Sequence, residues 1–185
     1  FFLIKNNVYK VDDESINSIK YQNFPEYFTQ SDKNHADRKE KGENDSYICQ
    51  LIRNDSIDEY IIYISQKNFS LTNTIKPSIY ETNSFLMNKN LTLLEYSFFF
   101  GSINIVKYLL NNGIELTKSL WPFAIHSNNA EMIQLLEDEN IIPQNNKETQ
   151  NYLEESIKCY HNEIASYIKE NYIYDESDFD KYFPA

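Results

Sequence analysis

One sequence feature constrains the fold more than any other: short segments with apolar residues at helical spacing recur along the chain in pairs. Within each segment the apolar residues repeat every three or four positions, which is typical of amphipathic α-helices. Two or three polar residues join the members of a pair, which suits a tight antiparallel turn. We therefore predict an all-α chain. The four predicted pairs are Tyr47–Arg53 with Ile57–Ser65, Thr92–Phe100 with Ile103–Asn111, Leu120–Ser127 with Glu131–Asp138, and Tyr152–Tyr160 with Glu163–Asn171.

The four pairs agree position by position, so they form an internal repeat. Alignment on Leu51, Ser97, Ala124 and Ser156 places an apolar residue three positions earlier and one position later in every pair. One helix pair cannot bury its apolar face alone, so the repeat predicts that successive pairs stack around a continuous core. Between the second and third pairs, we expect Leu94, Phe98, Val106 and Leu109 to pack against Trp121, Ile125, Ile133 and Leu136.

The repeat resembles the ankyrin repeat, whose consensus runs Thr-Pro-Leu-His-x-Ala-Ala, then Gly-His, Glu-Ile/Val-Val and Leu-Leu. The second pair carries the resemblance best. Residues 92–98 read Thr-Leu-Leu-Glu-Tyr-Ser-Phe, followed by Gly101-Ser102, then Asn-Ile-Val at 104–106, Leu-Leu at 109–110 and Asn-Gly-Ile-Glu-Leu at 112–116. The resemblance implies an ankyrin-type solenoid of stacked antiparallel helix pairs, a class of scaffold that binds protein partners in a concave groove.

A narrower resemblance rests on the runs 42–49, 95–102 and 119–126. They are similar to those of a divergent, uncharacterised ankyrin family that is expanded in trichomonad protists. Members of that family have no assigned activity, so this resemblance implies none for the chain.

The spacing of the repeat is uneven, which predicts an irregular solenoid. The alignment residues lie 46, 27 and 32 positions apart, whereas the ankyrin period is about 33 residues. The long gap holds an insertion, and the short third unit lacks room for a full hairpin finger. We predict a capping or flanking segment at 1–32 and a charged linker at 33–46. A repeat domain follows at 47–171, with units 47–72, 91–117, 119–141 and 149–172 and an insertion at 76–90. The acidic-aromatic tail at 173–185 acts either as a cap or as a docking peptide.

Charge and composition limit the classes of partner and the compartment that we expect for this chain. The formal net charge is −11, from 17 Lys and Arg against 28 Asp and Glu. This balance argues against nucleic acid and against anionic membrane surfaces, because both recruit basic proteins. The two cysteines, Cys49 and Cys159, make a poor disulfide framework and fit a reducing compartment. With no signal-peptide pattern at the start, we expect a cytoplasmic protein, with the nucleus as the second choice.

The sequence carries no familiar catalytic motif. Three glycines are too few for a phosphate or dinucleotide loop combined with the turns of a fold. Cys159-x-His161 alone is too short for a zinc site, which takes four ligands at characteristic spacings. We expect no enzyme activity, no cofactor, no metal and no small-molecule substrate.

The predicted binding surface is the concave groove, which the first helices line in ankyrin repeats. Phe99 and Phe123 fit a core or a groove position equally, whereas Tyr96 favours the groove because its hydroxyl tolerates water. Aromatic residues with a charged rim are typical of binding hot spots. The candidate partner-binding residues are Gln50, Arg53, Tyr96, Phe99, Phe123, His126, Glu155 and Lys158.

Three functional hypotheses follow. The first is a scaffold that holds a segment of a protein partner, a basic segment in view of the net charge. The second is a structural segment of a longer repeat array, which the absence of an initial methionine favours. The third is an enzyme with an unrecognised site built on His126 or Cys49.

Overall fold

A computed structural model describes residues 35–173 of the 185-residue chain. These residues are mostly helical, as predicted, and the one small sheet among them has two strands of two residues each. The predicted N-terminal segment 1–32 lies outside the described residues, as does nearly all of the predicted tail. The elements are α4 (His35–Lys41), α5 (Tyr47–Arg53), α6 (Ile57–Lys67), β1 (Thr74–Ile75), β2 (Leu91–Thr92), α7 (Leu93–Phe100), α8 (Ile103–Asn111), a 3-10 turn η1 (Lys118–Leu120), α9 (Trp121–Ser127), α10 (Ala130–Asp138), α11 (Asn146–Lys158) and α12 (Asn162–Tyr172).

The chain divides into two compact units. The described part of the smaller unit comprises residues 35–45 and 77–89, and the larger unit contains α5, α6, both strands and α7 to α12. In the smaller unit, the backbone N–H and the hydroxyl of Thr82 both donate to the carbonyl of Gly42, at 3.0 and 2.8 Å. The charged stretch predicted as a linker thus contains helix α4. Its Asp lies in the first turn and its basic residues in the last, where the helix dipole favours each sign.

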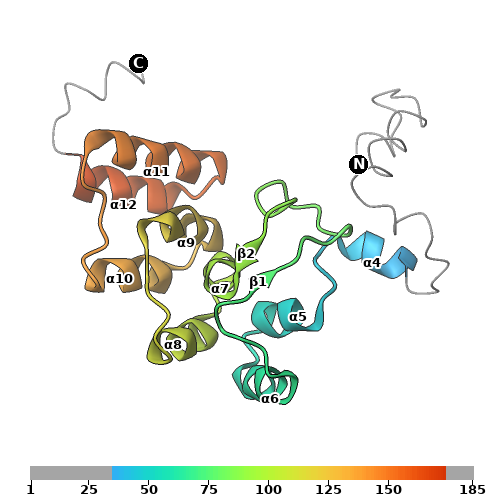
Figure 1. The fold of residues 1–185 in the computed structure, drawn as a ribbon. Helices are drawn as coiled ribbons and strands as arrows, with labels where there is room; N and C mark the ends of the chain where they lie inside the picture. The colour runs from blue at the N-terminus through green and yellow to red at the C-terminus, as the bar shows by residue number, and fades with distance from the viewer. Residues whose placement is uncertain (1–34, 174–185) are drawn as a thin grey trace, which may run out of the picture. The chain divides into compact units, whose positions relative to one another are not determined.

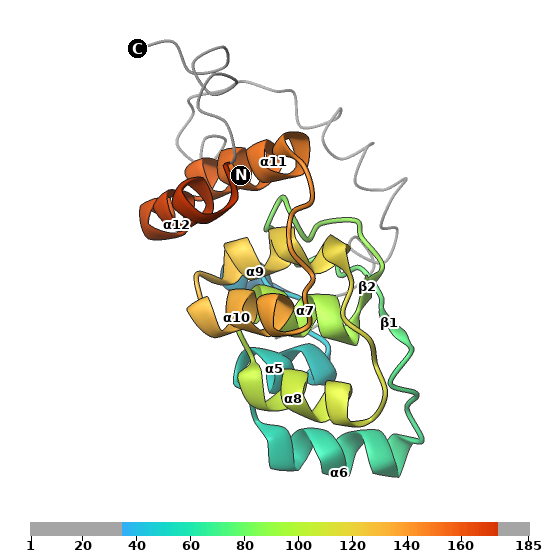
Figure 2. The same cartoon turned by 90° about the vertical axis from the view of Figure 1, so that its left-hand side faces the viewer.

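In the larger unit, all eight helices of the predicted pairs are present, with bounds within a few residues of those predicted except at the start of α11 (Figures 1 and 2). That helix begins six residues earlier, because Asn145 accepts from the backbone N–H of Glu148 and caps it. The first helices of successive pairs are in contact, α5 with α7, α7 with α9, and α9 with α11. The pairs therefore stack in chain order.

The same backbone turn joins the two helices of every pair. The residue four positions after each alignment residue has a positive φ, at Asp55, Gly101, Asn128 and Tyr160 (47°, 65°, 51° and 60°). Glycine and Asn adopt this left-handed conformation most readily, whereas a tyrosine there is unusual. The sequence repeat is thus also a repeat of backbone conformation, even where the residue type has changed.

Contacts between the first and second pairs replace a missing helix cap. Ser102 stands at the N-cap of α8 without capping it, and its hydroxyl donates instead to the carbonyl of Ile52 at 2.6 Å. The Asp55 carboxylate accepts from the backbone N–H groups of Asn104 and Ile105, at 3.0 Å each. Those N–H groups have no partner within the helix. The turn of one pair therefore caps the second helix of the next.

The core runs through the larger unit along the stacked helices. The residues expected at the interface of the second and third pairs are all buried, with exposed fractions of 5% or less. Trp121 is fully buried, and its indole N–H donates to the carbonyl of Ile141 at 2.7 Å. Its ring stacks on Tyr152 of α11, with centroids 5.1 Å apart, and meets the edge of Tyr172 of α12 at 5.8 Å. Trp121 therefore joins the third pair to the fourth.

Strands β1 and β2 pair antiparallel, with Thr74 opposite Thr92 and Ile75 opposite Leu91. The pairing brings together the two ends of the insertion predicted at 76–90. Thr92, the last residue of β2, forms a capping box with Glu95 that starts α7. The Thr92 hydroxyl accepts from the Glu95 N–H, and the Glu95 carboxylate accepts from the Thr92 N–H.

Candidate functional site

A continuous row of side-chain contacts crosses the four first helices of the larger unit. At its N-terminal end, a guanidinium nitrogen of Arg53 on α5 donates to the Tyr96 hydroxyl on α7 at 2.8 Å, and the guanidinium lies 6.0 Å from the centre of the Phe100 ring. The Phe100 ring meets Phe99 with centroids 5.0 Å apart. The row then passes to α9, because Phe99 stacks on the His126 ring at 5.3 Å and 25°.

The second half of the row joins α9 to α11. His126 Nε2 lies 2.8 Å from a carboxylate oxygen of Glu155, and the other carboxylate oxygen lies 3.6 Å from Lys158 Nζ. The side chains of His126 and Glu155 are 17% and 24% exposed, whereas Lys158 is 66% exposed. The row therefore has half-buried polar groups at its centre and an exposed cation at its C-terminal end.

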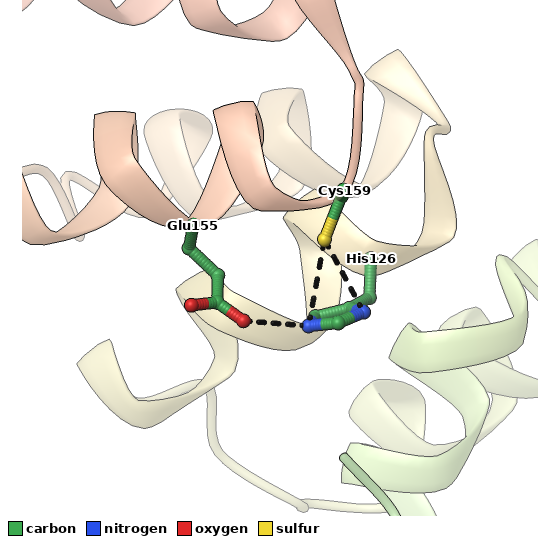
Figure 3. Close-up of side chains that lie close together, drawn as sticks. All are labelled: His126, Glu155 and Cys159. Atoms are coloured by element: carbon green, nitrogen blue, oxygen red, sulfur yellow. Dashed lines mark hydrogen bonds and ion pairs between the residues drawn. The ribbon is translucent and has the colours of Figure 1, made fainter. Parts of the chain in front are cut away.

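Cys159 completes a cluster around the His126 imidazole, which Figure 3 shows together with Glu155. The Cys159 Sγ atom lies 3.5 Å from Nδ1 and 3.6 Å from Nε2 of the ring. Because these distances are almost equal, the sulfur lies over the ring and not in line with the lone pair of either nitrogen. The imidazole thus contacts both Phe99 and the Cys159 sulfur, while its Nε2 edge faces Glu155.

The local fold explains how these side chains meet. Glu155 and Cys159 are four residues apart on α11 and at its C-cap, so they share one face of the helix. The N–H of Cys159 donates to the carbonyl of Glu155 at 3.0 Å, which extends the helical turn to the cysteine. His126 lies in the last turn of α9, which packs on α11. Repeat stacking thus brings together residues 29 and 33 positions apart.

The chemistry of the cluster is that of a protonated thiol. Burial raises the pKa of the Cys159 thiol above its usual value, the Glu155 carboxylate raises it further, and Lys158 lowers it in part. A reactive catalytic cysteine has a lowered pKa, because the thiolate is the nucleophile. The hypothesis of an enzyme that uses a cysteine at neutral pH gains no support from Cys159. Cys49, the other cysteine, is fully buried.

The structure corrects the predicted exposure of Tyr96. This residue was expected to face the groove, but it is 1% exposed. Its hydroxyl is satisfied inside the protein by Arg53, so burial leaves no unpaired polar group there. Phe99 and Phe123, for which core and groove positions were equally open, are 9% and 6% exposed and belong to the core. The expected strip of exposed aromatic rings is therefore absent from this part of the structure.

Three of the other predicted site residues are at least partly exposed to solvent. Gln50 on α5 and Lys158 on α11 are exposed, and Arg53 is half-buried. Six of the eight candidate residues form the connected row from Arg53 to Lys158. Sequence reasoning missed Phe100, which belongs to the row, and Cys159, which contacts His126. The position of Cys159 one helical turn after Glu155 was a signal that placed both on one face.

A pocket of about 290 Å³ lies on the second helices, between α10 and α12. Its apolar lining includes Ile133 and Ile164, and the carboxylates of Glu137 and Glu163 border it. The hydroxyl of Tyr167 donates to Glu137 at 2.8 Å. Burial, the hydrogen bond to Glu137 and the charge of that carboxylate raise the pKa of Tyr167. The pocket is acidic and lies away from the row.

Comparisons with known proteins leave the chain without an assigned family. No family model matches it, and neither the curated proteins nor the solved structures include a significant match. Among residues 35–173, none of the helices is long and apolar enough to cross a membrane.

Proposed function

We propose that the larger unit is an irregular ankyrin-type solenoid that works as a protein-binding scaffold. Support for the fold comes from the four stacked helix pairs, the same left-handed turn within every pair and the short β1–β2 hairpin between the first two pairs. Fold alone does not define a function. The proposal for binding therefore rests on the surface that the first helices carry.

The observation that carries the proposal is the row from Arg53 to Lys158. It connects Arg53 on α5, the aromatic rings of α7, His126 on α9, and Glu155 and Lys158 on α11 through one set of side-chain contacts. Such a surface is fixed before binding, so a partner segment does not have to order it. The aromatic rings act as a rigid support, and Gln50, Arg53 and Lys158 are the groups that a partner reaches. The net charge of −11 favours a partner segment that is itself basic.

Site-specific photo-crosslinking in lysate of the source cell tests this proposal. A photoreactive amino acid replaces Gln50 on α5 in one protein and Ile62 on α6 in a second. Both positions are exposed, but Gln50 lies one helical turn before Arg53 on the first helix α5, whereas Ile62 belongs to a second helix and lies outside the row. We expect a partner protein to be captured from position 50 and not from position 62.

The partner identified in this way is then produced and its affinity measured. Lys158→Glu should strengthen binding of a basic segment, because it replaces a cation at the end of the row with an anion, while Ile62→Ala should leave the affinity unchanged. Capture from both positions alike, or an affinity that Lys158→Glu does not alter, would place the binding surface elsewhere. Capture of only further copies of this chain would favour a segment of a longer repeat array.

A further inference from the structure

We propose that His126, Glu155 and Cys159 form a zinc site with three protein ligands and one position left for water or a partner. The three side chains offer the nitrogen, oxygen and sulfur atoms that zinc binds in proteins. Their ligand atoms all lie within 4.8 Å of one another. The inference does not require the proposed scaffold function, although His126 and Glu155 also belong to the row.

The distance between the sulfur and Nε2 is of the size that a tetrahedral site requires, but the side chains must rearrange because the sulfur lies over the ring. Zinc bond lengths of about 2.0–2.1 Å to nitrogen and oxygen and about 2.3 Å to sulfur imply ligand separations of about 3.4 Å between nitrogen and oxygen and about 3.6 Å between sulfur and either. The sulfur of Cys159 is 3.6 Å from His126 Nε2, and the Glu155 oxygen is 2.8 Å from it. The carboxylate must therefore withdraw by about 0.6 Å, and the sulfur must turn from the ring face toward Nε2.

The elements around the cluster allow these movements while holding the ligands together. Glu155 and Cys159 occupy one face of the same helix, one turn apart, which fixes the separation of their backbones. Phe99 stacks on the imidazole and supports the orientation of the ring. All three ligands are partly exposed, so an ion can reach them from solvent.

The mixture of donors selects the kind of ion. Magnesium and calcium take oxygen ligands, and a site in which two of three donors are imidazole and thiol does not suit them. Zinc accepts nitrogen, sulfur and oxygen together and is usually tetrahedral in proteins. Binding replaces the proton of the Cys159 thiol with the metal ion, and this proton is released to solvent.

The competing explanation is a clasp without metal, in which the Glu155–His126 hydrogen bond simply holds α11 on α9. The Glu155→Gln variant separates the two explanations. A glutamine carbonyl still accepts a hydrogen bond from the imidazole but is a poor ligand for zinc. The zinc site therefore predicts a loss of zinc affinity in a protein whose stability without metal is nearly unchanged, whereas a clasp predicts no zinc affinity to lose.

The experiment uses the full chain, reduced and freed of metal, and titrated with zinc in competition with a coloured chelator. We expect one zinc per chain, with micromolar or tighter affinity, and a rise in melting temperature with zinc. Cobalt substituted for zinc should show a thiolate-to-cobalt charge-transfer band. Cys159→Ser, His126→Ala and Glu155→Gln should each weaken zinc binding more than about tenfold, the lower limit for groups that only support a ligand.

Two control variants match these changes. His161→Ala removes a histidine two residues from Cys159 that does not belong to the cluster, and Cys49→Ala removes the other thiol of the chain. Both should keep the zinc affinity, and Cys49→Ala should keep the cobalt band. Absence of zinc binding overturns the proposal. Binding that survives all three cluster variants, or that falls equally in His161→Ala, also overturns it, because the ion would then be held elsewhere.

Discussion

Removal of the Trp121 side chain should destabilise the protein strongly. Trp121 is fully buried and is the only tryptophan of the chain. It stacks on Tyr152, meets the edge of Tyr172 and donates to the carbonyl of Ile141. In Trp121→Ala, the contacts between the third and fourth helix pairs and the hydrogen bond to the loop between them are lost together.

The contacts of Trp121 set the expected size of the effect. Truncation of a buried aromatic residue to alanine costs about 3–5 kcal/mol through lost burial and the cavity that remains. Two aromatic pairs, each worth about 0.5–1.5 kcal/mol beyond burial, are lost as well. The Ile141 carbonyl loses its donor, which costs about 1 kcal/mol. These contributions overlap, so we expect a loss of about 4–5 kcal/mol in the free energy of unfolding.

Equilibrium unfolding in urea, followed by far-ultraviolet circular dichroism, measures this loss without depending on tryptophan fluorescence. Trp121→Phe is the matched control, since it keeps a ring against Tyr152 but removes the indole N–H, and it should cost about 1–3 kcal/mol. A loss below about 1 kcal/mol in Trp121→Ala, at an unchanged denaturant slope, would refute the assigned packing.

Four further predictions concern stability and can be checked by the same unfolding measurement. Gly101→Ala should cost about 1–2 kcal/mol and more than Gly113→Ala, because both have positive φ but only at Gly101 does the added methyl group meet a side chain, at 3.2 Å. Asp55→Gly keeps the positive φ accessible but removes the cap of α8, which should cost about 2 kcal/mol. Tyr60→Phe should stabilise the protein by up to about 1 kcal/mol, because the buried Tyr60 hydroxyl has no hydrogen-bond partner within the described residues. Burial raises the pKa of Tyr60 and Tyr96 far above the usual value. As the pH rises, the unfolded chain therefore loses these two protons before the folded protein does, at about pH 10. The free energy of unfolding should thus be unaffected by these groups below that pH and should fall above it.

The sequence predicts the helices well because their signals are local. Apolar spacing and polar turn residues lie within a few positions of one another, and eight helices follow from them. The cap of α8 by Asp55 shows where such reasoning ends, because acceptor and donors are 49 and 50 positions apart. Ser102 has the residue type of an N-cap, but the carbonyl of Ile52 takes its hydroxyl.

The site was predicted in part for a similar reason. Helical spacing places Arg53, His126 and Glu155 on the first-helix face, and the structure connects them in one row. The sequence alone favours an exposed Tyr96, because it shows the polar hydroxyl but not the partner that this hydroxyl finds inside the protein. Residues of α7 are apolar on nearly every side, which is typical of a helix surrounded by protein. Arg53, which is 43 positions from Tyr96 in the sequence, donates the hydrogen bond that allows the Tyr96 hydroxyl to be buried.

The pairing of β1 with β2 has a consequence for how this chain tolerates change. The segment between the strands begins and ends at the same place beside the helix pairs, because Thr74 lies opposite Thr92 in the two-stranded sheet. For a loop whose ends are fixed in this way, doubling its length costs only about 0.6 kcal/mol of closure entropy. Lengthening of this segment at its exposed positions should therefore leave the register of the helix pairs in place, whereas exchange of residues 77–89 would remove the buried Tyr80 and Leu86 from the smaller unit. The hairpin is a natural junction at which a foreign segment can be grafted without dismantling the stack.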